Sequence, residues 1–512
     1  MDVAVLFWCC VAFSVLAIRM GMVLADWLGI VDRPGGHKQH EAGTPFVGGF
    51  GIMAVLAGLF LFFDPLLTGL SFSPRVGLLL GALVLFLTGL ADDILHLNFK
   101  LRFVIQAMVA LSMVTIGQVE LVSLGELLPD MRLDLGLLSI PVTVFATVGL
   151  INAVNMIDGI DGLSGSVSLV SLLLTGLVAF IGGQSAYVTL TAALIAGVVG
   201  FLYYNLRYPG NNRARVFLGD NGSMVLGFVF AWLFIALSQG AESSAMTPVT
   251  ALWLFALPLM DTVGVMLRRI WLGKSPFRPD RHHLHHLLVR AGFRVCDIVT
   301  FSVAMQLSLG LIGVAGMLMD VPDYLMFWLF LMMFAAYALV IMRPWRLVPQ
   351  LRRINRSLGL PSTQAEGIFV GRVRRETFPE LLGAIERRLG AADFNYQLGV
   401  YQAGRSTSDG RSVYCVVRIP VNGNEWLISK VGREARALKK HLAPRFGVEV
   451  RLFMCRMREN DLRGGSIVAQ PTNFVRNLDR RGARDTLIYS MERGGGPLVG
   501  EAVGFEVSVP PA

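Results

Sequence analysis

Charged residues are scarce in this sequence of 512 residues: Asp, Glu, Lys and Arg make up 16% of it, against about 25% in soluble domains. Hydrophobic residues make up 54% of the chain, and its mean hydropathy is +0.59. A soluble fold of this length has no interior that could bury so much apolar surface. The composition therefore excludes a chain built only of soluble domains and indicates a polytopic membrane protein.

Cysteine is also rare. The five residues are scattered at Cys9, Cys10, Cys296, Cys415 and Cys455, without a Cys-x-x-Cys pair or the Cys/His spacing of a zinc site. The sequence thus gives no sign of a disulfide framework or of structural zinc. The apolar start of the chain also lacks a basic n-region and a small-residue cleavage site. We therefore predict a first membrane span there, not a cleaved signal peptide.

Eleven apolar runs have the length, about 17–25 residues, that a helix needs to cross a bilayer. The predicted spans are residues 3–25, 46–63, 76–92, 101–118, 138–156, 164–182, 186–204, 222–238, 248–270, 299–319 and 322–342. Hydropathy falls beyond Arg343. We predict an all-α polytopic membrane protein with about eleven transmembrane helices (1–342), a basic linker (343–360) and a cytoplasmic α/β domain (361–512).

The loops between the predicted spans differ in charge. One alternating set holds 14 Lys and Arg residues, whereas the opposite set holds two, Arg75 and Arg132. The basic set comprises residues 31–45, 92–102, 205–222 and 268–298. Since cytoplasmic loops carry the excess of Lys and Arg, we predict that the N-terminus lies outside and the C-terminal domain in the cytoplasm.

The C-terminal domain shows mixed periodicity. Alternating runs at 396–401, 413–419 and 448–454 predict strands, and 378–389 and 432–442 predict helices. From residue 361 onward, 23 Lys and Arg stand against 16 Asp and Glu. This surplus favours contact with anionic lipid of the inner leaflet, with another protein of the pathway as the alternative. No motif indicates nucleic-acid binding.

Two adjacent carboxylates, Asp92 and Asp93, lie at the predicted cytoplasmic end of the third span. Carboxylates there are costly unless they meet a cation or take part in proton transfer. Neighbours on a helix point about 100° apart, so we expect the two to divide roles. Lys100 and Arg102 follow closely, which favours an anion site. A helix end that simply faces water is the alternative.

Four polar residues, Asn152, Asn155, Asp158 and Asp161, recur at steps of three along the fifth predicted span and its end. On a helix such a spacing places them in one slanted stripe, with apolar residues between them. Oxygen-bearing side chains at close quarters suit Mg²⁺ and phosphate ligands. A polar seam that joins helices is the alternative.

A third segment, residues 215–223, places Asp220 between glycines just before the next predicted span. Small neighbours allow a ligand to approach this carboxylate closely. The ring of Phe217 could stack on a base. An ordinary loop turn is the alternative.

Histidines cluster in residues 282–286, which contain four of the eight in the chain. Imidazoles beside Arg281 and other basic residues suit an anion such as a diphosphate. The predicted ligands are His283, His285 and His286. No cysteine accompanies them and the basic surroundings repel a cation, so zinc is the weaker alternative; an incidental loop is the other.

The loop after the first predicted span, residues 33–49, is rich in Gly and Pro, which indicate tight turns. Its His37, Lys38 and His40 add positive or hydrogen-bond-donating groups. By itself this segment predicts a turn, with Lys38 as a candidate for substrate binding.

Taken together and in this order, five segments resemble the polyprenyl-phosphate N-acetylhexosamine-1-phosphate transferase family, also called glycosyltransferase family 4. They read HKQHEAGTPFVGG (37–49), ADDILHLNFKLR (91–102), NAVNMIDGIDGLSG (152–165), RVFLGDNGS (215–223) and SPFRPDRHHLHHLLVRAGF (275–293). The resemblance covers about residues 1–342. The histidine block looks like the WecA type, which uses UDP-N-acetylglucosamine. It looks less like the MraY type, which uses UDP-MurNAc-pentapeptide.

The resemblance implies transfer of a sugar-1-phosphate from a UDP-N-acetylhexosamine to undecaprenyl phosphate, with release of UMP. It implies Mg²⁺, or Mn²⁺ in its place, a bacterial inner membrane and a lipid-linked surface glycan such as O-antigen or exopolysaccharide as the product served. A transfer of this kind needs mainly positioning and charge neutralisation. The resemblance implies catalytic roles for Asp92, Asp93 and Asp158, metal binding by Asp220 and Asn155, and substrate binding by Lys38, Lys100, Asn152, Asp161, Phe217, Arg281, His283, His285 and His286.

One departure from the family is His96, where WecA-type relatives usually have Asp. It puts a carboxylate role at that position in doubt and leaves the sugar and acceptor open. Direct attack by the lipid phosphate is our preferred mechanism over a covalent intermediate, and a homodimer stays open. An ion-coupled transporter is the alternative of another class. The acids lie at one face and no repeat is evident, which disfavours it.

Overall fold

The computed structural model describes residues 3–28, 31–32, 44–62, 67, 69–209, 211, 213–239, 244–276, 282–358, 367–374, 378–391, 396–402, 412–419, 425–446, 448, 450–453, 486–492 and 497–499. The chain divides into two compact units. One comprises residues 1–291 and 295–351, and the other comprises 292–294 and 352–512. Each is described by itself.

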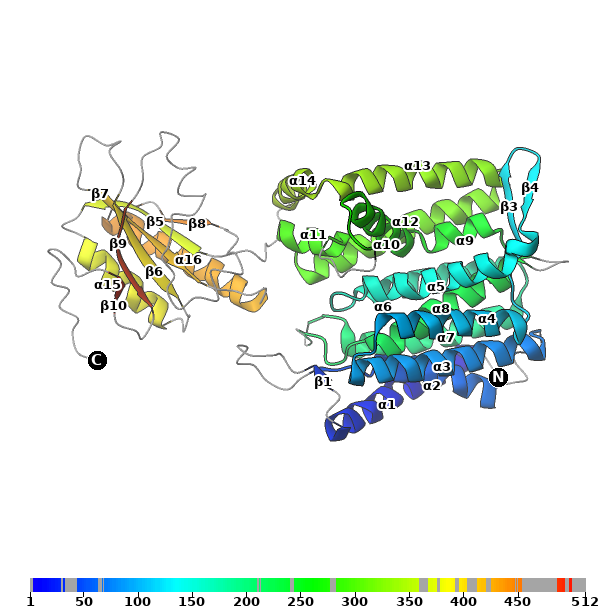
Figure 1. The fold of residues 1–512 in the computed structure, drawn as a ribbon. Helices are drawn as coiled ribbons and strands as arrows, with labels where there is room; N and C mark the ends of the chain where they lie inside the picture. The colour runs from blue at the N-terminus through cyan, green and yellow to red at the C-terminus, as the bar shows by residue number, and fades with distance from the viewer. Residues whose placement is uncertain are drawn as a thin grey trace. The chain divides into compact units, whose positions relative to one another are not determined.

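The first unit is a bundle of helices that lie side by side (Figure 1). Its helices are α1 (Val3–Leu28), α2 (Gly48–Phe62), α3 (Phe72–Leu95), α4 (Phe99–Thr115), α5 (Ser139–Ile157), α6 (Leu163–Ile181), α7 (Ser185–Asn205), α8 (Gly219–Ser238), α9 (Pro248–Leu254), α10 (Ala256–Trp271), α11 (Leu284–Ala291), α12 (Val295–Leu318) and α13 (Asp323–Met342). Helix α14 (Pro344–Ser357) begins in this unit, which ends at residue 351. Two antiparallel strand pairs join them: β1 (Val31–Asp32) with β2 (Thr44–Pro45), and β3 (Ser123–Leu128) with β4 (Met131–Asp134).

Among the described residues, eight helices are long and apolar enough to cross a membrane, or nine when α9 and α10 are counted as one span. The polytopic membrane class is confirmed, whereas the described residues do not confirm all eleven predicted spans. Helix α2 has only 15 residues and α4 only 17, and α4 begins with Lys100 and Arg102 in its first turn. Both helices therefore fall short of a full apolar span.

Helix α8 is the centre of this unit. In its apolar window 89% of the residues are buried, against 61% or less in the other spans. Glycines bring its first turn close to two neighbours. A Cβ on Gly89 of α3 would lie 2.3 Å from the backbone nitrogen of Asn221, and one on Gly49 of α2 would lie 2.1 Å from the Asn221 side chain. The ends of α2, α3 and α8 can meet because these positions carry no side chain.

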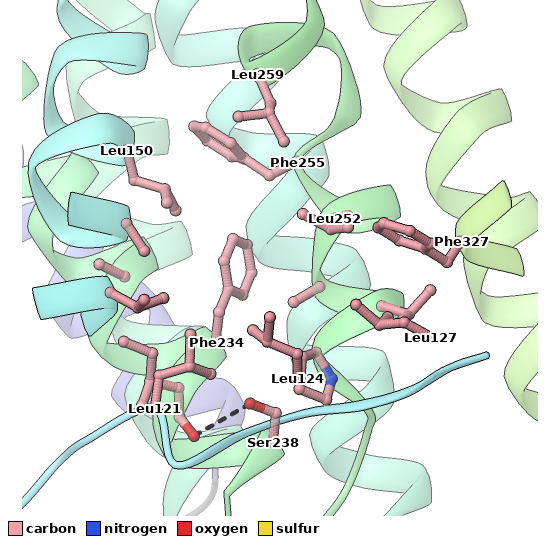
Figure 2. Close-up of a pocket in the computed structure, with 17 residues that line it drawn as sticks. Leu121, Leu124, Leu127, Leu150, Phe234, Ser238, Leu252, Phe255, Leu259 and Phe327 are labelled. Atoms are coloured by element: carbon pink, nitrogen blue, oxygen red, sulfur yellow. Dashed lines mark hydrogen bonds between the residues drawn. The ribbon is translucent and has the colours of Figure 1, made fainter. Parts of the chain in front are cut away.

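Helices α9 and α10 meet at an angle of 85°. The break leaves backbone groups near Phe255 without helical partners. Gln306 of α12 satisfies two of them: its amide donates to the Leu254 carbonyl at 2.7 Å and its Oε1 accepts from Leu257 N at 2.9 Å. Beside the break lies an apolar cavity of about 290 Å³, lined by residues of α5, α8, β3, α9, α10 and α13 (Figure 2).

The segment predicted as a linker is mostly helical, since α14 covers residues 344–357. Leu347 and Val348 of α14 pack against a small buried cluster formed by Val265, Leu287 and Ile341. The apolar face of α14 thus extends the first unit beyond the last span. This packing is the physical reason why the segment is ordered as a helix.

The second unit contains a six-stranded sheet in the order β10-β9-β6-β7-β5-β8, with antiparallel neighbours. Its elements are β5 (Gly367–Arg374), α15 (Phe378–Ala391), β6 (Gln397–Gln402), β7 (Ser412–Arg418), α16 (Glu425–Phe446), β8 (Val450–Phe453), β9 (Thr486–Glu492) and β10 (Pro497–Val499). Along the chain, β5, α15 and β6 form one β-α-β unit, and β7, α16 and β8 form a second. In the sheet, β7 lies between β5 and β6, and β5 lies between β7 and β8, so both units are split β-α-β units.

Both helices of the second unit cover one face of its sheet. Val370 lies opposite Cys415 in the β5–β7 pair, and Leu398 lies opposite Val417 in the β6–β7 pair. Residues opposite each other share a face. The same buried cluster contains side chains of α15 and α16, among them Leu381.

Candidate active site

A polar cavity of about 640 Å³ collects residues from six separate segments of the first unit. Its lining residues are Phe46, Asp92, Asp93, His96, Leu97, Arg102, Asn155, Asp158, Gly159, Ile160, Asp161, Asn205, Phe217, Gly219 and Asp220. Seven of the residues predicted from the sequence are among them: Asp92, Asp93, Asn155, Asp158, Asp161, Phe217 and Asp220. Helix packing thus brings together motifs that lie more than 100 residues apart.

Arg102 of α4 connects two of the carboxylates. Its Nη1 forms an ion pair with Asp92 of α3 and lies 3.1 Å from Oδ2 of Asp220 at the start of α8. Asp92 is only 5% exposed and also accepts a hydrogen bond of 2.7 Å from Leu97 N. Its carboxylate is therefore held by one backbone donor and one guanidinium.

Asp220 faces the cavity from the first turn of α8. Gly219 before it has a φ of +75°, which a residue with a side chain rarely adopts. Asn155 donates hydrogen bonds to the Asp220 carboxylate and to Oγ of Ser223, the latter at 3.0 Å. The amide of Asn155 thus fixes the orientation of Asp220.

Asp93 has a different role from its neighbour. It accepts from the backbone N–H groups of Asp220 at 3.0 Å and Asn221 at 3.3 Å, and from the Asn221 amide at 2.6 Å. The same Asn221 amide donates to the Phe46 carbonyl at 2.9 Å. A carboxylate on the first N–H groups of a helix stabilises that helix end. Asp93 therefore positions Asp220.

Helix α5 ends at Ile157, so the predicted polar stripe does not continue as a helix through Asp158 and Asp161. Asp158 accepts from Ser164 Oγ at 2.5 Å, and burial raises the pKa of Asp158 to about 6. Asp161 accepts from Arg207 Nε at 2.7 Å. The two carboxylates thus lie on the cavity wall in a turn.

The aromatic residue of the third motif lines the cavity beside a second ring. The ring centroids of Phe217 and Phe46 are 5.7 Å apart. Phe217 N donates to the Pro45 carbonyl, and Gly48 N donates to the Phe217 carbonyl, each at 2.9 Å. These bonds hold both rings at one side of the cavity.

The histidine motif is anchored by a residue that sequence analysis missed. Asp261 of α10 is 2% exposed. Its carboxylate lies 2.9 Å from Nδ1 of His283 and accepts from Leu284 N at 2.9 Å and from Tyr337 Oη at 2.7 Å. An acidic residue inside an apolar run was the available signal.

His285 is also buried, at 2% exposure, and burial lowers its pKa to about 3. Neither ring nitrogen has a hydrogen-bond partner within the described part of the chain. A Cβ on Gly159, which lines the cavity, would lie 2.3 Å from His285 Nε2. His285 therefore lies directly behind the cavity wall. The centroids of its ring and the ring of His286 are 4.2 Å apart.

Some predicted residues lie elsewhere. Asn152 donates to the Gln106 side chain and to the Val148 carbonyl, both at 2.8 Å, so it joins α4 to α5 and is not a cavity residue. This is the polar seam that we had given as the alternative. Lys100 is exposed and is not among the described residues that line the cavity. Lys38 and Arg281 lie outside the described residues.

The donor atoms at Asp92, Asp220 and Asn155 are oxygens, which suit Mg²⁺ and Mn²⁺. Both carboxylates face one positive group, Arg102, so their shared negative charge suits a cation. Within the described ranges, no group of three or more His, Cys, Asp or Glu is placed to hold a metal. Few protein ligands are enough for Mg²⁺, because water and substrate phosphates complete its coordination.

Comparison with known proteins decides the family. The model of glycosyl transferase family 4 matches residues 75–238. An undecaprenyl-phosphate alpha-N-acetylglucosaminyl 1-phosphate transferase of Salmonella typhi is 37% identical over 352 residues, which are 68% of this chain and 93% of the relative. The chain belongs to glycosyl transferase family 4. A protein of the same name from Escherichia coli K12 is 36% identical over 350 residues, which are 68% of this chain and 93% of that relative. Another from Haemophilus influenzae is 37% identical over 337 residues, which are 65% of this chain and 92% of that relative.

The matched range of glycosyl transferase family 4 contains most of the cavity. It extends from before Asp92 to the end of α8 and includes Arg102, Asn155 and Asp220. Asp261 and the histidines lie beyond it. The family resemblance stated from the five motifs is confirmed.

Proposed function

We propose that this protein transfers N-acetylglucosamine-1-phosphate from UDP-N-acetylglucosamine to undecaprenyl phosphate and releases UMP. The observation that carries the proposal is the acidic cavity, which brings together residues from motifs of the family. The relative from Salmonella typhi that bears the name of this activity matches the chain over 93% of its own length. The product would start a lipid-linked surface glycan.

The reaction forms one bond and breaks one. An oxygen of the lipid phosphate attacks the phosphorus that carries the sugar, and the bond from this phosphorus to the bridging oxygen breaks, so UMP leaves. Asp92 orients the attacking phosphate or accepts its remaining proton. We favour direct attack because the described residues that line the cavity include no Ser, Thr or Cys that could act as a nucleophile.

The remaining residues bind the donor. Asp220 and Asn155 would hold Mg²⁺ or Mn²⁺, which supplies charge neutralisation for the diphosphate when bound. Neutral His285, whose Nε2 lies next to Gly159 of the cavity wall, can donate a hydrogen bond to a phosphate oxygen that binds beside this glycine. Phe217 and Phe46 offer a stacking surface for the uracil.

The acceptor requires apolar space near the polar cavity, and α5 reaches both. Leu150 lines the apolar cavity of Figure 2, whereas Asn155, five residues further along, lines the polar one. We infer that the isoprenoid chain follows α5 away from the site. The polar cavity then faces the cytoplasm, in line with the basic loops, and the N-terminus lies outside a bacterial inner membrane.

The test is a UMP-release assay with the full-length protein in detergent. Undecaprenyl phosphate and Mg²⁺ are supplied with UDP-N-acetylglucosamine, UDP-N-acetylgalactosamine or UDP-MurNAc-pentapeptide. We expect release with the first donor, dependent on the lipid, and loss with Asp220→Asn. Release with UDP-MurNAc-pentapeptide alone would contradict the proposed donor, and no release with any donor would contradict the function.

A further inference from the structure

We propose that Arg102 is a movable counter-cation: it neutralises Asp92 and Asp220 in the metal-free site and leaves Asp220 when a divalent cation binds, so that its guanidinium is available to the donor diphosphate. The inference rests on the proposed function for the identity of the diphosphate. The competition between Arg102 and the cation stands on geometry alone.

The first step is the placement of one guanidinium nitrogen between two carboxylates. Nη1 of Arg102 contacts Asp92 and lies 3.1 Å from Asp220. Two carboxylates from different helices would repel each other at this separation without a cation between them. Arg102 therefore supplies the charge that offsets this repulsion in the absence of metal.

The second step is that Arg102 and a metal ion compete for the same oxygens. Oδ2 of Asp220 faces Arg102, whereas Oδ1 accepts from Asn155. A divalent cation at Asp220 needs an oxygen that the guanidinium now occupies. Arg102 is 29% exposed and Asp220 is 26% exposed, so this pair can separate toward the cavity more readily than the pair with buried Asp92.

The third step is the destination of the guanidinium. Arg102 lines the same cavity as the residues assigned to the donor. A guanidinium binds phosphate oxygens through two parallel hydrogen bonds, which a Lys cannot reproduce. Movement from carboxylate to phosphate keeps Arg102 paired throughout and couples donor binding to metal binding.

The experiment measures Mn²⁺ binding by electron paramagnetic resonance, using the full-length protein in detergent without nucleotide. Arg102→Gln should bind Mn²⁺ about tenfold more tightly than wild type, because one adjacent cation shifts the proton affinity of a carboxylate by a similar factor or more. The matched control is Arg132→Gln, which removes an Arg that pairs with Asp134 on an exposed strand. It should leave Mn²⁺ affinity unchanged.

A second measurement uses UDP at saturating Mn²⁺. Arg102→Gln should bind UDP about tenfold more weakly, since a hydrogen bond to a charged group is lost. If a thermal unfolding experiment shows that Arg102→Gln is not folded, Arg102→Met is used instead, because it retains the aliphatic part of the side chain. Mn²⁺ binding that is unchanged or weaker in the folded variant would overturn the proposal. Wild-type UMP release is measured in parallel, so failure of the proposed function is seen separately.

Discussion

Single residues in this cavity differ in task although their chemistry is the same. Asp92 and Asp93 are adjacent on α3, yet one forms an ion pair with Arg102 and the other accepts backbone N–H groups at the start of α8. The difference follows from the turn of about 100° between neighbours on a helix. Asp92 therefore lines the cavity beside Arg102, whereas Asp93 acts through the position of Asp220.

The pH dependence of the reaction gives a test of His285. Burial lowers its pKa to about 3, so the imidazole binds a proton only in strong acid and is neutral throughout pH 6–9. His285→Gln should reduce turnover by about a hundredfold, as expected when a donor to developing charge is lost. The factor should be the same at every pH in this range.

The check is the ratio of wild-type to variant UMP release from pH 6 to 9. A ratio that changes tenfold across one pH unit near 6.5 would show that His285 titrates there, against this prediction. His441→Gln in α16 is the matched control, because His441 is exposed and belongs to the second unit. It should not alter the rate.

At the scale of elements, the contact between α3 and α8 sets the geometry of the site. Gly89 lies against the backbone of Asp220 and Asn221, so even a methyl group has no space there. Gly89→Ala should force the two helices apart and weaken the bonds that Asp93 makes to α8. Overpacking of this kind typically costs about 1–3 kcal/mol.

Thermal unfolding and UMP release in detergent measure this effect. Gly89→Ala should lower the unfolding temperature and reduce activity further than the stability loss explains. Gly149→Ala in α5 provides the control, because a Cβ there would meet nothing within 4 Å. It should match wild type or be slightly more stable. Full activity of Gly89→Ala would show that the close approach does not position the site.

At the scale of the whole molecule, every described residue that lines the cavity belongs to the first unit. Truncation after residue 358 removes the sheet and its two helices but keeps α14, whose Leu347 and Val348 pack on the first unit. UMP release in detergent should therefore persist. Truncation after residue 342 exposes the apolar cluster under α14 and should lower the unfolding temperature.

These two truncations are compared by UMP release and thermal unfolding. A folded protein ending at residue 358 without activity would mean that the second unit contributes to catalysis. The second unit buries its own apolar cluster between the sheet, α15 and α16. We propose a regulatory or membrane-contacting role for it, in line with its surplus of basic residues.

The sequence by itself determined the membrane class, because the apolar composition and the long apolar runs leave no soluble alternative. Seven of the fifteen residues that line the cavity were also predicted from the sequence, because each belongs to a short motif whose side chains indicate its chemistry. Eleven spans were not confirmed, because the described helices α2 and α4 are shorter than the predicted runs, and apolar content alone does not show where a helix begins and ends.

Only the tertiary structure decided which side chains face each other. Arg102 meets Asp220 across 118 positions of sequence, and Asp261 meets Tyr337 across 76. Asn152 and Asn155 belong to the same motif with steps of three residues, yet Asn152 donates to Gln106 of α4 and does not line the cavity. Contacts of this kind depend on how helices pack, not on the spacing within one motif. The motifs indicate which type of chemistry the site can perform, and the packing of α3, α4, α5 and α8 determines which of their side chains face the cavity.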